Sequence, residues 1–182
     1  MMLPLLRWFG GKYRACKRTV AAMPEHDTYV EPFAGGASVF FNKKPVATNV
    51  LGDKQEWLIE FYDQVRRGGL RRCKPIDCRG IAKVVGADCA YRDPCCTLHM
   101  NGTSYSGNMV VTDGTRACST GKKKLEHIDE YESMLKQAYL NTADWQDNME
   151  RFDSLTTLHY LDPPYTEDSV ATGGATRHYH GN

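Results

Sequence analysis

No apolar run in the sequence is long enough to cross a bilayer, and residues 1–7 are too few for a secretory signal peptide with its cleavage site. A charge excess is also lacking, because 23 Lys and Arg stand against 22 Asp and Glu, for a net charge of +1. No overall field therefore favours nucleic acid or a membrane as a partner. We expect a cytoplasmic globular protein with no membrane partner, in which any basic binding surface is local.

Paired CxxC motifs are absent, although the chain contains seven cysteines. Without an export signal, reduced thiols are expected. The six cysteines that follow Cys16 match no familiar zinc spacing, and the adjacent pair Cys95-Cys96 is awkward for one tetrahedral ion. We therefore expect no metal site.

Internal repeats and low-complexity linkers are lacking too, so the chain can be interpreted as one domain. Its first third alternates short β-prone runs with glycine-rich or helical segments. The predicted order is a strand at 28–31, a glycine-rich turn at 32–36, a helix at 37–42, a strand at 47–51 and a helix at 56–67. This order is typical of the start of a doubly wound α/β sheet.

Residues 68–124 break this alternation and are rich in Cys, Gly, Asn and Thr, which predicts an insertion. A helix is predicted for residues 125–139, and a strand for 155–161 that leads to Asp162. We therefore expect a sheet domain formed by 1–67 and 125–182.

The strongest chemical motif is Asp162-Pro163-Pro164-Tyr165, at the end of the last predicted strand. Two prolines fix the backbone, and ligands of open α/β sheets bind beyond the carboxyl ends of strands. A carboxylate, a carbonyl and an aromatic ring at such a place can hold an exocyclic amine by its two N–H groups. A strand-ending Pro-Pro turn looks the same, so the tetrapeptide alone leaves both interpretations open.

Three weaker signals accompany it. The turn Glu31-Pro32-Phe33-Ala34-Gly35-Gly36 lets a ligand approach the backbone, although plain loops also use glycine pairs. Asp53 ends the next strand, where an acid can bind a ribose diol or cap the following helix. The segment Arg7–Lys12, with Trp8 and a glycine pair, can form a polar-aromatic loop or simply cover the core.

Together and in this order, these motifs resemble the Dam-like DNA adenine N6-methyltransferases. The family's W-x-G-G-K, E-P-F-x-G-G and D-P-P-Y motifs match Trp8–Lys12, Glu31–Gly36 and Asp162–Tyr165. Its second-strand acid matches Asp53, with Gln55 where Asn is usual. A segment of its target-recognition region resembles residues 101–107, although Gly102 stands where the family has Arg.

The resemblance implies an S-adenosylmethionine-dependent enzyme with a Rossmann-like methyltransferase fold and double-stranded DNA as its partner. Its catalytic residues would be Asp162, Pro163, Pro164 and Tyr165. The cofactor would be bound by Trp8, Lys12, Glu31, Pro32, Phe33, Gly35, Gly36, Asp53, Asp144 and Asp162. DNA would be contacted by Asn101, Tyr105, Lys122, Lys123 and Lys124.

Only 17 residues (182 − 165) follow Tyr165, whereas family members continue with further strands. We therefore expect an incomplete sheet and little activity from the chain alone. The alternative is a non-catalytic remnant, or one half of a split enzyme that needs a partner segment or chain. A third interpretation keeps the chemistry but takes an amine of RNA or a glutamine side chain as substrate.

Overall fold

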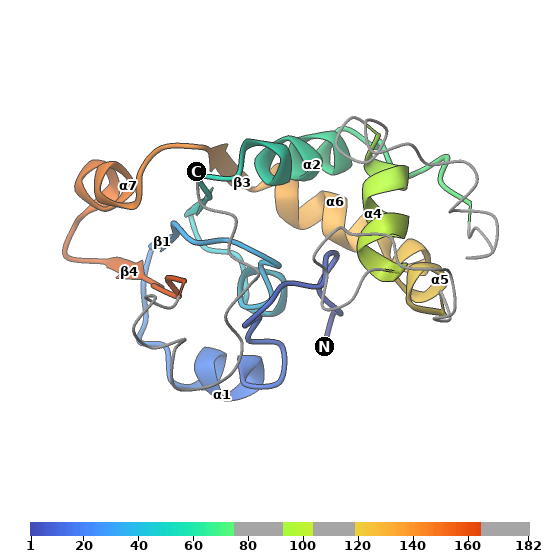
Figure 1. Cartoon of the computed structure of the whole chain (residues 1–182). Helices are drawn as coiled ribbons and strands as arrows, with labels where there is room; N and C mark the ends of the chain where they lie inside the picture. The colour runs from blue at the N-terminus through green and yellow to red at the C-terminus, as the bar shows by residue number, and fades with distance from the viewer. Residues whose placement is uncertain (75–92, 104–118, 165–182) are drawn as a thin grey trace, which may run out of the picture.

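A parallel sheet organises the residues that this computed structural model describes, 1–74, 93–103 and 119–164 (Figure 1). Its strands are β1 (Thr28–Glu31), β2 (Thr48–Gly52), β3 (Ala138–Asn141) and β4 (Thr157–His159). They lie in the order β3-β2-β1-β4, all parallel. The chain thus proceeds outward from β1 through β2 to β3, and then returns to the other side of β1. This reversal is a topological switch point, and it confirms the predicted Rossmann-like fold.

The helices within the described residues are α1 (Cys16–Ala21), the 3-10 turn η1 (Phe40–Asn42), α2 (Glu56–Arg66), α4 (Pro94–Thr103), α5 (Ser119–Glu126), α6 (Ile128–Lys136) and α7 (Trp145–Phe152). Helix α2 buries one apolar face, formed by Leu58, Phe61, Tyr62 and Val65. It packs beside α6, and Figure 1 shows this pair next to β3. None of the helices in the described part of the chain is long and apolar enough to span a membrane.

Two predicted helices differ from the structure. The helix expected at 125–139 is interrupted at His127 and ends at Lys136, because Ala138–Asn141 pairs with β2 as strand β3. The helix expected at 37–42 is reduced to the 3-10 turn Phe40–Asn42, because Ala37 has a positive φ of 46° that an α-helix cannot contain. Helices α1 and α7 were not predicted.

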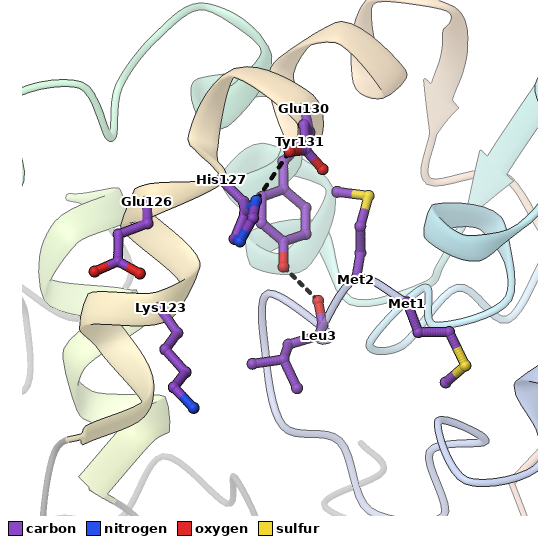
Figure 2. A pocket seen from close by; sticks show the side chains of 8 residues that line it. All are labelled: Met1, Met2, Leu3, Lys123, Glu126, His127, Glu130 and Tyr131. Atoms are coloured by element: carbon purple, nitrogen blue, oxygen red, sulfur yellow. Dashed lines mark hydrogen bonds and ion pairs between the residues drawn. The ribbon is translucent and has the colours of Figure 1, made fainter.

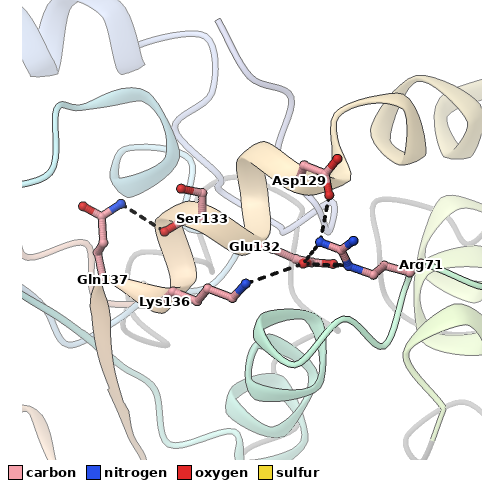
Figure 3. Close-up of polar contacts among 6 residues, drawn as sticks. All are labelled: Arg71, Asp129, Glu132, Ser133, Lys136 and Gln137. Carbon is pink, nitrogen blue, oxygen red and sulfur yellow. Dashed lines mark hydrogen bonds and ion pairs between the residues drawn. The ribbon is translucent and has the colours of Figure 1, made fainter.

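A buried carboxylate joins α6 to the turn that follows α2 (Figure 3). The Glu132 side chain is 2% exposed, and Arg71 Nε donates to both of its oxygens at 3.0 Å. Arg71 Nη2 also donates to Asp129 Oδ1 at 2.9 Å, and Lys136 Nζ lies 4.0 Å from Glu132 Oε2. Since a buried carboxylate without a cation is strongly unfavourable, these contacts fix the position of α6.

The N-terminal segment, residues 2–8, belongs to no helix or strand, and side chains hold its backbone. Two amide side chains each bind both the N–H and the C=O of one residue: Asn42 of η1 binds Met2 (2.8 and 2.9 Å), and Asn101 of α4 binds Arg7 (2.6 and 2.9 Å). Two further side chains donate to carbonyls: Lys124 of α5 to Leu5 (2.6 Å) and Tyr131 of α6 to Leu3 (2.5 Å). Leu5 and Leu6 are completely buried. The segment is therefore a fixed part of the core.

A hollow of about 400 Å³ lies beside this segment, between the first residues and helices α5 and α6 (Figure 2). Figure 2 shows Tyr131 donating to the Leu3 carbonyl and His127 bound to Glu130 at its rim. Lys123 is the only predicted site residue in its lining. The hollow is therefore separate from the motifs at the end of the sheet.

Candidate active site

The carboxyl ends of β1 and β4 bring two predicted motifs together at the switch point. Val30 pairs with His159, and Tyr160 N–H donates to the Val30 carbonyl at 2.8 Å. The glycine turn leaves β1 one residue further on, and the segment leading to Asp162 leaves β4. Motifs more than a hundred residues apart in the sequence therefore lie together at the carboxyl end of the sheet.

The turn's glycines accommodate the N-terminal segment. Gly35 has a φ of +45°, and a Cβ there would lie 2.7 Å from Trp8 Cδ1. At Gly36 a Cβ would lie 2.9 Å from the Leu6 carbonyl oxygen. Trp8 therefore approaches both glycines closely, and contact of a ligand with this turn stays a prediction. The centre of the indole ring also lies 5.9 Å from that of the Trp57 ring. This second contact holds the indole in place beside the turn.

Asp53 connects the ends of the first two strands. Its Oδ2 accepts the Gly35 N–H at 3.0 Å, and its Oδ1 accepts the Gln55 N–H at 2.9 Å. Burial raises the pKa of Asp53, whereas these two hydrogen bonds lower it. The N-cap position of helix α2 is occupied by Gln55. Asp53 is therefore not the cap residue, and it binds the backbone of the glycine turn instead. Each oxygen keeps a second lone pair for another donor.

Lys12 and Asp162 join the first and last motifs. Lys12 Nζ lies 2.5 Å from Asp162 Oδ1 and also donates to the Gly10 carbonyl at 2.8 Å. The two side chains are 33% and 28% exposed, so the pair adds little to stability. Its effect is instead to orient the Asp162 carboxylate toward the N-terminal loop.

Glu31 lies beneath the turn and faces the core. It is 3% exposed, and Tyr29 Oη donates to its Oε2 at 2.7 Å. Burial raises the pKa of Glu31 to about 8. Burial also lowers the pKa of Lys43 to about 8, with Lys43 Nζ 4.4 Å from the centre of the Tyr29 ring. Glu31 therefore supports the turn from below, and a direct contact with a cofactor stays a prediction.

Asp144 lies at the start of α7, on the β2 side of the site. It accepts the Gln146 N–H at 3.3 Å as the helix N-cap, and Lys54 Nζ lies 2.5 Å from its Oδ2. The hydrogen bond from Lys54 is the main cause that lowers the pKa of Asp144. Phe33, from the glycine turn, stacks on Trp145 with ring centres 6.5 Å apart. An acid and a pair of rings thus border the turn.

Two residues predicted to contact DNA point inward. The Asn101 side chain is completely buried against the Arg7 backbone, and Lys124, at 3% exposed, binds the Leu5 carbonyl. Burial lowers the pKa of Lys124 to about 8. Both residues therefore secure the N-terminal segment, which is a correction to their predicted role. Lys123 is exposed on α5. Tyr105, Tyr165 and the Lys122 side chain lie outside what the structure describes.

The cysteines also differ from expectation. Cys73 and Cys95 form a disulfide, and Cys96 is disulfide-bonded too, whereas reduced thiols were predicted. Cys16 is a free, buried thiol whose Sγ lies 3.4 Å from the Ser38 carbonyl. Cys78, Cys89 and Cys118 lie outside the described residues.

The β3-β2-β1-β4 sheet, with its chemical residues beyond the ends of β1 and β4, defines a Rossmann-like methyltransferase fold. Residues 8–74 match the model of the family described as D12 class N6 adenine-specific DNA methyltransferase. This match agrees with the resemblance that the sequence motifs indicate.

Curated relatives cover most of the chain. It is 26% identical to the Type II methyltransferase M.CviBI of Paramecium bursaria Chlorella virus NC1A, over 94% of this chain and 71% of the relative. It is 27% identical to the DNA adenine methylase of Escherichia coli (strain K12), over 97% and 69%. The DNA adenine methylase of Haemophilus influenzae is 34% identical over 40% of this chain and 27% of its own length.

The contact between Trp8 and Gly35 predicts how substitutions combine. Gly35→Ala should destabilise the protein, because Ala at positive φ costs about 1–2 kcal/mol and its Cβ meets the indole. In a Trp8→Ala background the loss should become smaller without vanishing, since the backbone strain remains. Urea unfolding of the four proteins measures this coupling. Gly68→Ala is the matched control, because Gly68 has φ +85° and no contact with Trp8 among its nearest atoms. Equal losses in both backgrounds at Gly35 would contradict the contact.

The raised pKa of Glu31 predicts a pH dependence of stability. Between the usual value of 4.5 and the folded value of about 8, the folded state keeps a proton that the unfolded state releases. The contribution of Glu31 is therefore complete below pH 4.5 and is lost toward pH 8, at up to about 1.4 kcal/mol per pH unit. Glu31→Gln should remove this decline, and the exposed Glu25→Gln should keep it. Free energies of unfolding from pH 5 to 8 provide the measurement, and parallel profiles for wild type and Glu31→Gln would refute the assignment.

Proposed function

We propose that the chain transfers a methyl group from S-adenosylmethionine to N6 of adenine in double-stranded DNA, using the edge of the sheet between β1 and β4. The observation that carries this proposal is the Lys12–Asp162 pair, 2.5 Å apart, beside the Gly35 turn at the switch point. A Rossmann-like sheet binds its ligand at this point. The family match specifies the reaction as adenine N6 methylation.

The residues at this edge fit the proposed cofactor. Asp53 is held by two backbone N–H groups and has lone pairs left for a ribose diol. Lys12 uses two of its three N–H groups within the chain, which leaves one for a carboxylate. Asp144 and the stacked rings of Phe33 and Trp145 provide an edge for a purine. When bound, S-adenosylmethionine supplies a methyl group on a sulfonium, which is an electrophile.

Asp162 and Pro163 carry the chemistry of the acceptor in this proposal. The adenine is rotated out of the duplex, because its N6 is paired and stacked there. Its two N–H groups donate to the Asp162 carboxylate and the Pro163 carbonyl, which draws the lone pair of the nitrogen away from the ring. Lys12 holds Asp162 by Oδ1, so Oδ2 is the oxygen left to receive the amine. Tyr165 is proposed to stack on the base.

Catalysis then consists of positioning, with no covalent intermediate on the protein. The acceptor nitrogen must lie in line with the methyl group, and rigid residues keep it there. Pro163 and Pro164 limit the backbone after β4, and the N-terminal segment fixes Lys12 from the opposite side. The proposed site therefore combines Lys12, near the N-terminus, with the residues that follow β4.

For DNA, we propose that the insertion 68–124 provides the recognition surface, with Lys122 and Lys123 as phosphate contacts. Lys123 is exposed on α5, as a phosphate ligand must be. Asn101 and Lys124 are left out of this surface because they face the core. No observation on the described residues favours a remnant that only binds cofactor or DNA, or a substrate in RNA or protein.

Asp53 provides the test of cofactor binding. Asp53→Asn keeps an acceptor for the Gly35 turn but removes the charge, so affinity for S-adenosylmethionine should fall by about 1.5–3 kcal/mol, roughly tenfold to 150-fold in Kd. Calorimetry of wild type and variant measures this loss. Asp27→Asn, an exposed acid before β1, is the control that should bind like wild type. An unchanged Kd for Asp53→Asn would remove Asp53 from the proposed site.

Asp162 provides the test of the reaction. Wild type should place label from methyl-labelled S-adenosylmethionine on adenine N6 of mixed-sequence DNA, and Asp162→Asn should lose at least about a hundredfold in rate. Protein in excess over DNA makes even slow transfer visible, and digestion to nucleosides identifies the product. Asp153→Asn, an exposed acid before β4, should leave the rate unchanged. A 5-methylcytosine product would contradict the proposal, because that chemistry needs a cysteine nucleophile and neither motif contains one.

A further inference from the structure

A cluster of two cysteines and one histidine lies away from the proposed active site. Cys73 follows the turn after α2, while Cys95 and His99 lie one helical turn apart on α4. The ligand atoms of all three residues lie within 4.8 Å of one another. From this geometry we infer a metal site: when the Cys73–Cys95 disulfide is reduced, Cys73, Cys95 and His99 bind a zinc-type divalent cation.

The distances agree with tetrahedral coordination. Zn–S bonds of about 2.3 Å and Zn–N bonds of about 2.0–2.1 Å place a sulfur and a nitrogen about 3.5 Å apart around one ion. His99 Nε2 lies 3.4 Å from Cys73 Sγ. The two sulfurs, bonded to each other here, need to separate to about 3.8 Å. Side-chain rotation at the two cysteines provides such a movement, because Cys95 lies in the first turn of α4 and Cys73 beyond the end of α2.

His99 is buried on α4 and lies beside the Cys73 sulfur. A neutral imidazole can bind a metal through either of its ring nitrogens. Nε2 also lies 3.1 Å from the Lys74 carbonyl, which makes it the protonated nitrogen in the disulfide form. For metal binding the proton moves to Nδ1, and the Nε2 lone pair turns to the ion. Two thiolates and a neutral imidazole are the donors that zinc prefers.

The disulfide and metal forms exclude each other, because both use the same sulfurs. A two-electron reductant such as a phosphine cleaves the S–S bond: water supplies the oxygen of the phosphine oxide and the protons of two thiols. Binding of the cation then releases both thiol protons and leaves two thiolates on the ion. The described residues contribute three ligands here, and a water molecule can complete the four.

Either form joins the chain at residue 73 to the start of α4, and therefore closes both ends of the segment between them. Helix α4 in turn carries Asn101, which binds the Arg7 backbone next to Trp8. The cation would thus fix the proposed recognition insertion on the sheet domain. This inference stands on the cluster alone and does not depend on methyl transfer.

The test uses the full chain, purified without metal and treated with a phosphine or left oxidised. Zinc is titrated against a chromophoric chelator, and cobalt(II) serves as a coloured substitute that reports tetrahedral thiolate ligands. We expect the reduced protein to bind one ion per chain, at least about a hundredfold more tightly than the oxidised protein. Cys73→Ser and His99→Gln should each lose about a hundredfold or more in affinity. His99→Gln can still donate to the Lys74 carbonyl, so that it tests coordination rather than packing.

Cys16→Ser is the matched control, because Cys16 is a free thiol on α1 whose Sγ donates to the Ser38 carbonyl. It should bind the ion like wild type. Thermal unfolding in excess chelator shows whether each variant is folded, and a folded His99→Gln carries the test if Cys73→Ser is not. Failure of the reduced protein to retain an ion, or equal affinity in the cluster variants and Cys16→Ser, would overturn the site.

Discussion

The close contact of Trp8 with Gly35 is the constraint on which the rest of the site depends. It requires a glycine at positive φ in the turn after β1, and it requires the N-terminal segment to pass over that turn. Once the segment lies there, Lys12 reaches Asp162 and Gly10, so the acid beyond β4 acquires a defined orientation. The indole thereby links two sequence motifs that have no strand pairing with each other. A ligand at this turn meets the edge of Trp8 in addition to bare backbone.

Two carboxylates of the site, Glu31 and Asp162, differ in how deeply they are buried, and this difference suits them to different roles. Glu31 is enclosed beneath the turn, with a pKa raised to about 8 by burial and a hydrogen bond from Tyr29. Such a group stays largely protonated near neutral pH and supports the turn as a neutral acid. Asp162 lies beside Lys12 with its side chain 28% exposed, so that its carboxylate is accessible from solvent. Only the latter environment suits an acid that has to accept hydrogen bonds from an amine.

Much of the sheet could be predicted from the sequence, because its strands and their turns carry local signals. Thr28–Glu31 was predicted within its exact bounds, and α2 ends one residue earlier than expected. Strand β3 was missed because four residues, Ala138–Asn141, directly follow a helix and have no alternation of their own; their pairing with β2 decides their conformation. The start of α7 did have a signal, an Asp at the N-cap position before Trp145. The burial of individual side chains could not be predicted from the sequence. Nothing in the local sequence distinguishes Lys124, whose ammonium is buried, from the exposed Lys123.

The inward orientation of Asn101 and Lys124 changes how the insertion relates to the sheet domain. Both residues bind carbonyls of the N-terminal segment, at Arg7 and Leu5, and Asn101 also accepts the Arg7 N–H. These are buried polar groups, so loss of either partner leaves atoms unsatisfied at a cost of roughly 1–3 kcal/mol each. Helices α4 and α5 therefore cannot move away from the sheet domain without releasing residues 5–7. Trp8 directly follows Arg7. The position of its indole over the glycine turn therefore depends on how α4 and α5 pack against the N-terminal segment. In this arrangement, the insertion that we propose to contact DNA and the turn that we propose to face the cofactor are both held by residues 5–8.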